Sequence, residues 1–268
     1  DGSDLLRLTT SAAREDQPAP SPDGKTILFG SDRDGNPELY KMARDGSGVL
    51  RLTDTPEAES APAWSPDGQK IAYILSTKTA GDLYVMNADG SNPTDLSTDS
   101  RNDWSAAWSP DGTRLAVAAW GNGGAQLYTL LPDGSGETRL TELAGFAWSP
   151  VWAPDGKSLL FVSLPEPPEN LSGLFITESG KFFATAGNIF DLAPVQPGVY
   201  RVNADGSGAA AVAGIPLGSW APLFSPDGES VLYVSDSGGD QEIYSLPLSG
   251  GQPTNLTNNL AADNTPAR

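Results

Sequence analysis

Acidic and tryptophan side chains recur at matching positions along the chain, and they are its best candidates for binding or reaction. When the copies are aligned at steps of 44 or 72 residues, one position carries an acidic residue in four of them: Glu15, Glu59, Asp103 and Asp263. The next position carries Trp104, Trp148 and Trp220, with Asp16, Ser60 and Asn264 in the other copies. Indole rings can stack on sugars, peptides or partner side chains. We therefore expect a half-aromatic, half-acidic binding surface; the alternative is buried tryptophans and merely solvated carboxylates.

The chain contains no Cys and no His. This excludes Ser-His-Asp and Cys-His nucleophiles, and it removes the commonest ligands of zinc, copper and non-haem iron. A pair of carboxyl groups could still hydrolyse a glycoside if one had a raised pKa, and the acidic positions are the only candidates. We otherwise expect no enzyme activity, no catalytic residue and no cofactor.

One short segment resembles the beginning of a calcium-binding loop. Asp32, Asp34 and Asn36 place oxygen atoms at alternate positions, as calcium loops do. The distal Glu of such a loop is missing at the required distance. We favour a plain turn at this position.

Charge and hydropathy exclude several classes of partner. The 268 residues include 16 Lys or Arg and 34 Asp or Glu, for a net charge of -18. Because no run of basic residues could follow a phosphate backbone, we expect no binding to nucleic acid or to anionic membranes. No apolar stretch is long enough to cross a bilayer. The Cys-free, acidic, Gly- and Pro-rich composition, and a first residue other than Met, favour a processed protein of the periplasm or the extracellular space.

An internal repeat of 44 residues dominates the chain. The tetrapeptide Ser-Pro-Asp-Gly, or Ala-Pro-Asp-Gly in one copy, begins at residues 21, 65, 109, 153 and 225. Each copy offers room for four short strands with Pro-Asp-Gly and Asp-Gly turns, in which Pro presets φ and Gly accepts a positive φ. Four-stranded units of this kind close radially into an all-β propeller.

The motifs Trp-Ser-Pro-Asp-Gly, Leu-Tyr-Val-Met-Asn-Ala-Asp-Gly-Ser and Arg-Leu-Thr resemble the TolB-like propeller repeat. This resemblance covers about five copies and implies six blades of four antiparallel strands. Similar repeats occur in a periplasmic TolB protein, in the propellers of prolyl-oligopeptidase-type enzymes and in secreted proteins of no known activity.

The repeat divides the chain into one propeller domain, 1–268, with five complete blades and part of a sixth. The expected blades cover residues 15–53, 57–97, 103–141, 145–213 and 217–257. Residues 1–10 would be the outer strand of a partial sixth blade, and residues 258–268 would be its beginning. Its remaining strands would have to come from outside this chain.

The fourth copy carries an insertion at about residues 164–197. Its sequence predicts a hairpin between prolines, with Phe175, Phe182 and Phe183 far from the main core. The loops between second and third strands and between blades share one face, which varies in sequence and carries the insertion. We expect the apolar insertion to contact a partner there, or alternatively to fold back over the mouth of the channel.

Taken together, these features predict a non-catalytic, exported scaffold that binds a protein partner through its variable face, within a larger assembly. Two alternatives remain open at this stage. One is a propeller that binds or cleaves carbohydrate with its tryptophans, and the other is the gating propeller of a peptidase whose catalytic domain lies outside this chain.

Overall fold

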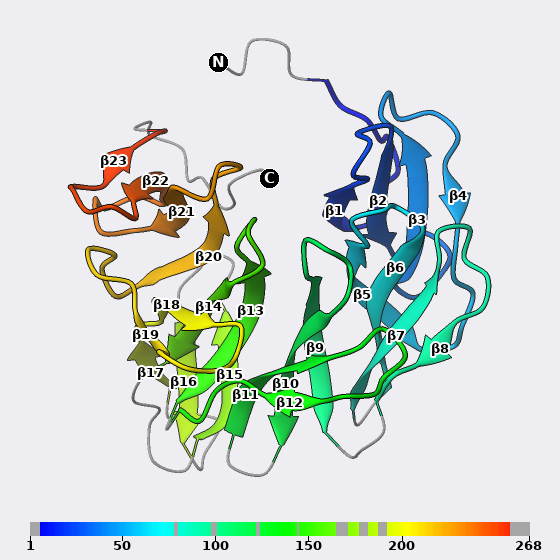
Figure 1. Cartoon of the computed structure of the whole chain (residues 1–268). Coiled ribbons are helices and arrows are strands. Elements are labelled where there is room, and N and C mark those ends of the chain that lie inside the picture. The colour runs from blue at the N-terminus through cyan, green and yellow to red at the C-terminus, as the bar shows by residue number, and fades with distance from the viewer. Residues whose placement is uncertain are drawn as a thin grey trace. The chain divides into compact units, whose positions relative to one another are not determined.

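The computed structural model describes residues 6–77, 80–97, 101–121, 124–143, 145–164, 171–176, 182–186 and 192–257, with only the backbone described between 171 and 195. These residues form antiparallel sheets (Figure 1). The chain divides into two compact units, residues 1–117 with 130–137 and residues 118–129 with 138–268. In the described part of the chain, no helix is long and apolar enough to span a membrane.

The first unit contains two complete four-stranded blades and the first strand of a third. The first blade consists of β1 (Glu15–Pro20), β2 (Thr26–Ser31), β3 (Glu38–Ala43) and β4 (Leu50–Arg51). The second blade consists of β5 (Ala58–Trp64), β6 (Lys70–Ser76), β7 (Gly81–Asn87) and β8 (Thr94–Asp95). Strand β9 (Asn102–Trp108) packs against the second blade. The two blades share a core in which Leu28 and Leu39 meet Ile71 and Met86, so burial of apolar surface joins them.

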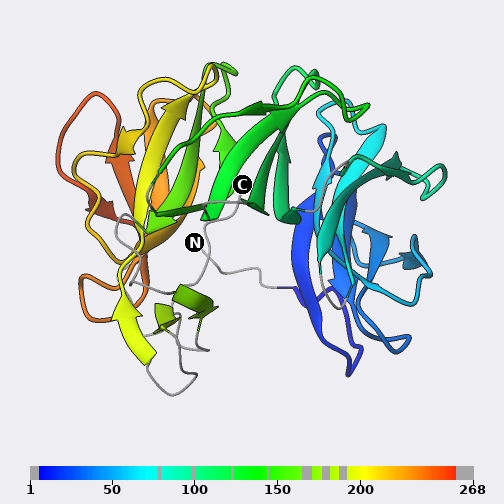
Figure 2. The same cartoon turned by 90° about the horizontal axis from the view of Figure 1, so that it is seen from below.

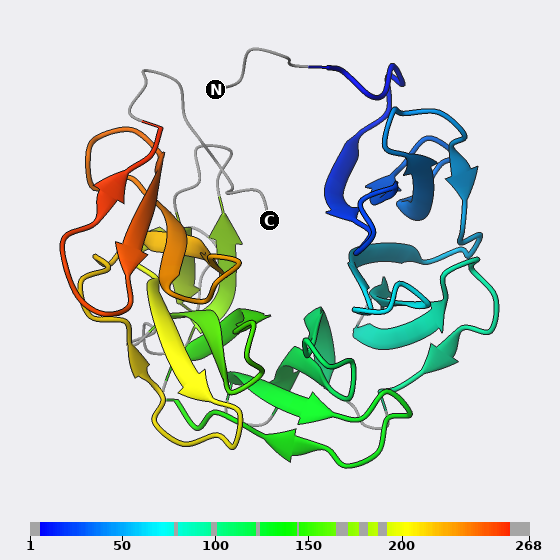
Figure 3. The same ribbon diagram turned by 45° about the horizontal axis from the view of Figure 1, so that its top comes forward.

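The third blade has strands in both units and the order β9-β10-β11-β12. Its remaining strands are β10 (Leu115–Gly121), β11 (Gly124–Leu130) and β12 (Thr138–Arg139). The fourth blade consists of β13 (Phe146–Trp152), β14 (Ser158–Leu164), β18 (Gly198–Asn203) and β19 (Ala210–Ala211). The fifth, orange to red in Figure 3, consists of β20 (Ser219–Phe224), β21 (Ser230–Ser235), β22 (Glu242–Pro247) and β23 (Thr254–Asn255).

The insertion in the fourth blade forms a sheet of its own (Figure 2). Its strands are β15 (Leu171–Ile176), β16 (Phe182–Ala186) and β17 (Leu192–Val195). The expected hairpin is present, with Phe175 opposite Phe183. The third strand, β17, was not expected.

The prediction of a sixth blade was wrong, because the described strands form five four-stranded blades. Residues 6–10, where an outer strand was expected, adopt no strand conformation. An outer strand forms only beside a hydrogen-bonded neighbour, and the described residues provide no inner strands of a sixth blade. The other parts of that expected blade, 1–5 and 258–268, lie outside the described residues.

The repeated Asp residues of the Pro-Asp-Gly turns have a structural role. In the second blade, the Ser65 hydroxyl donates to Asp67 Oδ1 at 2.6 Å, and the Gln69 N–H donates to the same oxygen at 3.0 Å. Gly68 has a φ of 68°, which L side chains rarely adopt. Hydrogen bonding to Ser65, followed by that to the Gln69 backbone, lowers the pKa of Asp67. The same arrangement recurs at Asp23, Asp111 and Asp227.

The first strands of four blades carry a β-bulge at an X-Pro pair. The residue before the proline has a positive φ in each case: Gln17, Ala61, Ser149 and Ala221. Such bulges bend a strand and change the direction of its side chains. Two of the tryptophans singled out by the repeat, Trp148 and Trp220, directly precede a bulge.

Candidate functional site

A stacked aromatic pair with one exposed ring, in the second unit, is the strongest candidate for a binding site. The ring of Trp120 stacks on the ring of Phe146 with centroids 4.8 Å apart and an angle of 16° between the planes. Trp120 is 39% exposed, whereas Phe146 is 8% exposed. Trp120 lies near the end of β10 and Phe146 begins β13, so the pair joins two successive blades at one end of their strands. A large indole surface that remains accessible is typical of a contact residue.

The buried side chain of Gln126 fixes the loop that leads into Phe146. Its Nε2 donates to the carbonyl oxygens of Leu143 at 3.0 Å and Gly145 at 3.2 Å. Its Oε1 accepts from the Thr141 hydroxyl at 2.8 Å and from the Leu143 N–H at 3.1 Å. Because every polar atom of this amide is bonded, Gln126 ties Thr141, Leu143 and Gly145 to β11, next to the strand that Phe146 begins.

Two further tryptophans and the root of the insertion belong to the same unit. Trp148 lies two residues after Phe146 on β13, and Trp220 occupies the equivalent position on the neighbouring strand β20. Both are partly buried. Phe146 pairs with Leu164, which ends β14 and is the first residue of the predicted insertion. The inserted sheet therefore leaves the fourth blade at the end where Trp120 and Phe146 lie.

The other aromatic residues singled out by the sequence are placed as follows. Trp104 lies partly buried on β9 in the first unit, apart in the chain from Trp148 and Trp220. Phe175 lies on β15, and Phe182 and Phe183 lie on β16. Only the backbone of these three phenylalanines is described.

The acids expected to form an exposed arc have different surroundings. Glu59 and Asp103 are buried, with exposures of 1% and 7%. The Ser97 hydroxyl donates to Asp103 Oδ2 at 2.6 Å and accepts the Leu83 N–H at 2.7 Å. Asp103 therefore ties the first strand of one blade to the last turn of the preceding blade.

Glu15 and Asp16 lie on β1 and are partly buried. Glu15 forms an ion pair with Arg33, and Asp16 Oδ2 forms one with Arg14 Nε at 2.9 Å. Asp16 and Glu59 line one cavity of about 240 Å³, together with Arg14, Asp32 and others. The structure thus brings two of the predicted acids to one cavity, while Asp263 lies outside the described residues.

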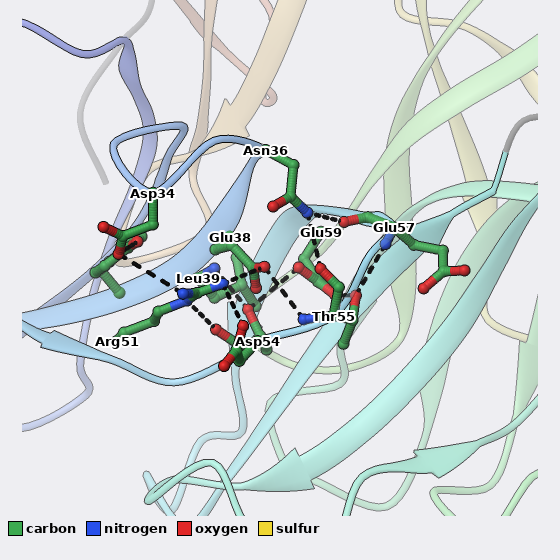
Figure 4. Close-up of polar contacts among 11 residues, drawn as sticks. Asp34, Asn36, Glu38, Leu39, Arg51, Asp54, Thr55, Glu57 and Glu59 are labelled. Atoms are coloured by element: carbon green, nitrogen blue, oxygen red, sulfur yellow. Dashed lines mark hydrogen bonds and ion pairs between the residues drawn. The ribbon is translucent and has the colours of Figure 1, made fainter.

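Glu59 belongs to a polar network at the junction of the first two blades (Figure 4). Its carboxyl oxygens accept from the hydroxyls of Thr55 at 2.6 Å and Thr53 at 3.2 Å. Glu38 Oε1 accepts from Arg51 Nη2 at 2.6 Å and from the Thr55 N–H at 3.2 Å. Burial raises the pKa of Glu59 to about 7, assisted by Glu38 and opposed by Thr55. Burial also opposes ionisation of Glu38, but the interactions with Thr53, Glu59 and Arg51 outweigh it and lower its pKa.

The three oxygen-bearing residues of the calcium-like segment point to separate partners. Asp32 Oδ1 accepts the Arg14 N–H at 2.9 Å, and Asp34 Oδ2 accepts the Tyr40 hydroxyl at 2.5 Å. Asn36 Nδ2 donates to the carbonyl oxygens of Thr55 and Glu57 (Figure 4). Within the described ranges, no group of three or more acidic side chains could hold a metal ion.

Sequence reasoning missed Trp120 and Gln126. Both have a detectable signal, because Trp120 is the one aromatic residue and Gln126 the one amide at their positions in the aligned copies. Trp120 stands where other copies carry Asp32, Ser76, Leu164 and Asp236. Gln126 stands where they carry Glu38, Asp82, Gly198 and Glu242.

Comparison with known proteins identifies the repeat. Residues 52–172 match the family model of the TolB beta propeller domain. The structure of a putative TolB from Agrobacterium tumefaciens is similar, with a TM-score of 0.70 and 22% identity, over 92% of this chain and 82% of that one. Residues 52–172 therefore carry a TolB-like propeller repeat, and the described chain resembles TolB in its fold.

Other solved structures share this TolB-like fold. TolB from Acinetobacter baumannii gives a TM-score of 0.66 and 22% identity, over 96% of this chain and 57% of that one. An oligogalacturonate lyase in complex with manganese gives a TM-score of 0.63 and 16% identity, over 94% of this chain and 68% of that one. The TolB-like chain therefore spans little more than half the length of the Acinetobacter protein. No curated protein sequence matches it.

Proposed function

We propose that this TolB-like propeller is a non-catalytic, exported interaction protein that binds a protein partner through Trp120 and its surroundings. The observation that carries the proposal is the accessible indole of Trp120, stacked on the nearly buried ring of Phe146. The hydrogen bonds of Gln126 hold this pair in place before any partner arrives, which lowers the entropic cost of binding.

The inserted sheet supports a protein as the partner. It leaves the fourth blade beside Phe146, and its sequence carries Phe175, Phe182 and Phe183. An inserted segment of apolar residues enlarges the contact area beyond what a single indole offers. We therefore include the three phenylalanines, with Trp148 and Trp220, in the proposed contact surface.

Several observations favour binding over catalysis. The best acid candidates for catalysis, Glu59 and Asp103, are buried and bonded to hydroxyl groups at blade junctions. In the part of the chain that the structure describes, no acidic cluster suited to a metal is found. The proposed export to the periplasm or the extracellular space rests on the likeness to TolB and on the acidic, Cys-free composition.

Co-purification from the producing organism tests the proposal. Tagged wild-type protein and the Trp120→Ala variant would be cross-linked in cells, purified and compared by quantitative mass spectrometry. We expect the recovery of at least one co-purified protein to be about tenfold lower, or lower still, with Trp120→Ala than with the wild type. The matched control is Leu50→Ala, an exposed apolar residue on the outer strand β4. If every co-purified protein were recovered equally with the wild type, Trp120→Ala and Leu50→Ala, the result would contradict the proposal.

A saccharide is the second candidate ligand. Exposed indole surface suits the apolar face of a sugar ring, and a structural relative is an oligogalacturonate lyase. Titration of the tryptophan fluorescence with neutral and acidic oligosaccharides would distinguish the two ligands. Saturable quenching that disappears in Trp120→Ala, without loss of a protein partner from that variant, would favour the saccharide.

A further inference from the structure

Two carboxyl groups meet at the junction of the first and second blades. Glu38 begins β3 and Glu59 lies near the start of β5, so the linker between the blades passes beside both. Glu38 is 0% exposed and Glu59 is 1% exposed. Placing two ionised carboxylates side by side in a buried site is costly, because neither is compensated by solvent.

The hydrogen bonds leave one oxygen of this pair without a donor. Glu38 Oε1 accepts from Arg51 and Thr55, whereas Glu38 Oε2 is buried and has no hydrogen-bond partner in the structure. A proton on the carboxyl group of Glu59 would supply the missing donor. The hydroxyls of Thr53 and Thr55, which contact Glu59, can accept as well as donate, so they tolerate either state.

The surrounding charges do not neutralise two carboxylates. Arg51 forms an ion pair with Glu38, and its guanidinium also faces Asp34 at 3.8 Å and Asp54 at 2.7 Å. The phenols of Tyr73 on β6 and Tyr40 on β3 also lie near the network, and burial raises the pKa of both. On the cavity side, Glu59 faces Arg14, Asp16 and Asp32, whose charges sum to one negative charge when all three are ionised. Arg51 is thus shared by Asp34, Glu38 and Asp54, so it does not also neutralise a negative charge on Glu59.

We propose that Glu38 and Glu59 share one proton, and that loss of this proton loosens the junction between the first two blades. The position of the pair explains why the junction responds. Thr53, which contacts Glu59, also accepts the Leu39 N–H at 2.9 Å, and the Glu59 N–H donates to the Pro37 carbonyl at 3.0 Å. Repulsion between two carboxylates therefore acts on the bonds that hold β3, the linker and β5 together.

The direction of both pKa shifts agrees with a shared proton. The pKa of Glu59 is raised to about 7 while that of Glu38 is lowered, as expected when one member of a pair retains the proton. Glu59 also lines the cavity of about 240 Å³ that contains Asp16. The charge of this cavity therefore changes as the proton leaves, and the junction acts as a pH-sensitive element near neutrality.

Nuclear magnetic resonance of the wild-type chain tests the proposal directly. The side-chain carboxyl carbons of Glu would be followed from pH 3 to pH 9, with Glu59→Gln used for assignment. We expect Glu59 to titrate near pH 7, the value to which its surroundings raise the pKa. A midpoint below about pH 5, close to that of an ordinary Glu, would overturn the proposal.

Amide hydrogen exchange tests the structural consequence. After correction for intrinsic exchange rates, protection of the Leu39 and Glu59 amides should fall about tenfold between pH 6 and pH 8. Glu59→Gln should abolish this dependence, because its amide carries no charge and can still donate to Glu38. Glu242→Gln, at the position of the fifth blade that matches Glu38, should leave the pH dependence at Leu39 and Glu59 unchanged. If amide protection in Glu59→Gln fell by the same factor between pH 6 and pH 8, the proposal would be overturned. If that variant does not fold, the titration of the wild-type chain decides alone.

Discussion

Trp120 and Phe146 lie face to face, 4.8 Å apart, although one ring is 39% exposed and the other is 8% exposed. The buried ring supports the exposed ring, so an indole surface is held at a fixed position against solvent. The stacking itself contributes about 0.5–1.5 kcal/mol. Its larger effect is to remove the rotational freedom that a partner would otherwise have to restrict.

Trp120→Ala should therefore reduce binding much more than stability. Because the indole is partly solvated, we expect the free energy of unfolding to fall by about 1 kcal/mol or less. Urea unfolding followed by circular dichroism would measure this change. Phe146→Ala is the comparison, since loss of a buried ring should cost about 3–5 kcal/mol. Similar losses in the two variants would show that the pair serves the core alone.

Gln126→Glu should destabilise the second unit more at pH 8 than at pH 5. The substitution removes the Nε2 donor to Leu143 and Gly145, and it places a carboxylate against their carbonyl oxygens. We expect a loss on the order of 2–4 kcal/mol for the ionised form. The control is Glu242→Gln, the reverse change at the matching position. If the denaturation midpoint of Gln126→Glu equals that of the wild type at both pH values, the positioning role of Gln126 is wrong.

Thr53→Val tests the hydroxyl bond that recurs at the blade junctions. Valine keeps the shape of threonine but leaves the buried Leu39 N–H without its acceptor. We expect a loss of about 1–3 kcal/mol in the free energy of unfolding. Thr94→Val, on the exposed strand β8, should change it by about 0.5 kcal/mol or less. Equal effects of the two substitutions would show that the hydroxyl bond is not stabilising.

The turn aspartates should make the protein sensitive to acid. Hydrogen bonds, led by those from Ser21, Ser65, Ser109 and Ser225, lower the pKa of Asp23, Asp67, Asp111 and Asp227 below the ordinary value of 3.8. A lowered pKa stabilises the folded state above the ordinary pKa, and this contribution disappears as the pH falls through the lowered value.

Replacing these four aspartates by Asn should therefore lower stability at pH 7 and flatten its decrease below about pH 4. Thermal unfolding between pH 2 and pH 7 would measure both effects. If the stability of the variant with all four substitutions decreased below pH 4 as steeply as that of the wild type, other carboxyl groups would account for the acid sensitivity.

Much of the fold could be predicted from sequence because its signals are local and repeated. The step from Ser65 to Ser109 marks one blade, and the turn that begins there needs only Ser, Asp and Gly at fixed spacing. The number of blades could not be predicted in this way. Residues 6–10 match an outer strand in sequence, but a strand forms only where a neighbouring strand is available.

The candidate site was harder to predict from sequence. Whether an acidic side chain near the start of a blade is buried depends on how the linker from the preceding blade folds over it. Glu59 and Asp103 looked like exposed acids, yet hydroxyl groups from the preceding blade enclose both. Trp120 was overlooked because it does not recur. Its departure from the repeat is the signal of interest, since the fold itself requires no aromatic residue at that position.

Site-specific photo-cross-linking from position 120 tests the central claim most directly. A photoreactive phenylalanine would replace Trp120 in one variant and Leu50 in another, both in the full chain and in the producing organism. We predict an abundant adduct with one protein from position 120 and none from position 50. Adducts of equal yield from both positions, or an adduct from position 50 alone, would contradict the claim that the surface around Trp120 binds a protein partner.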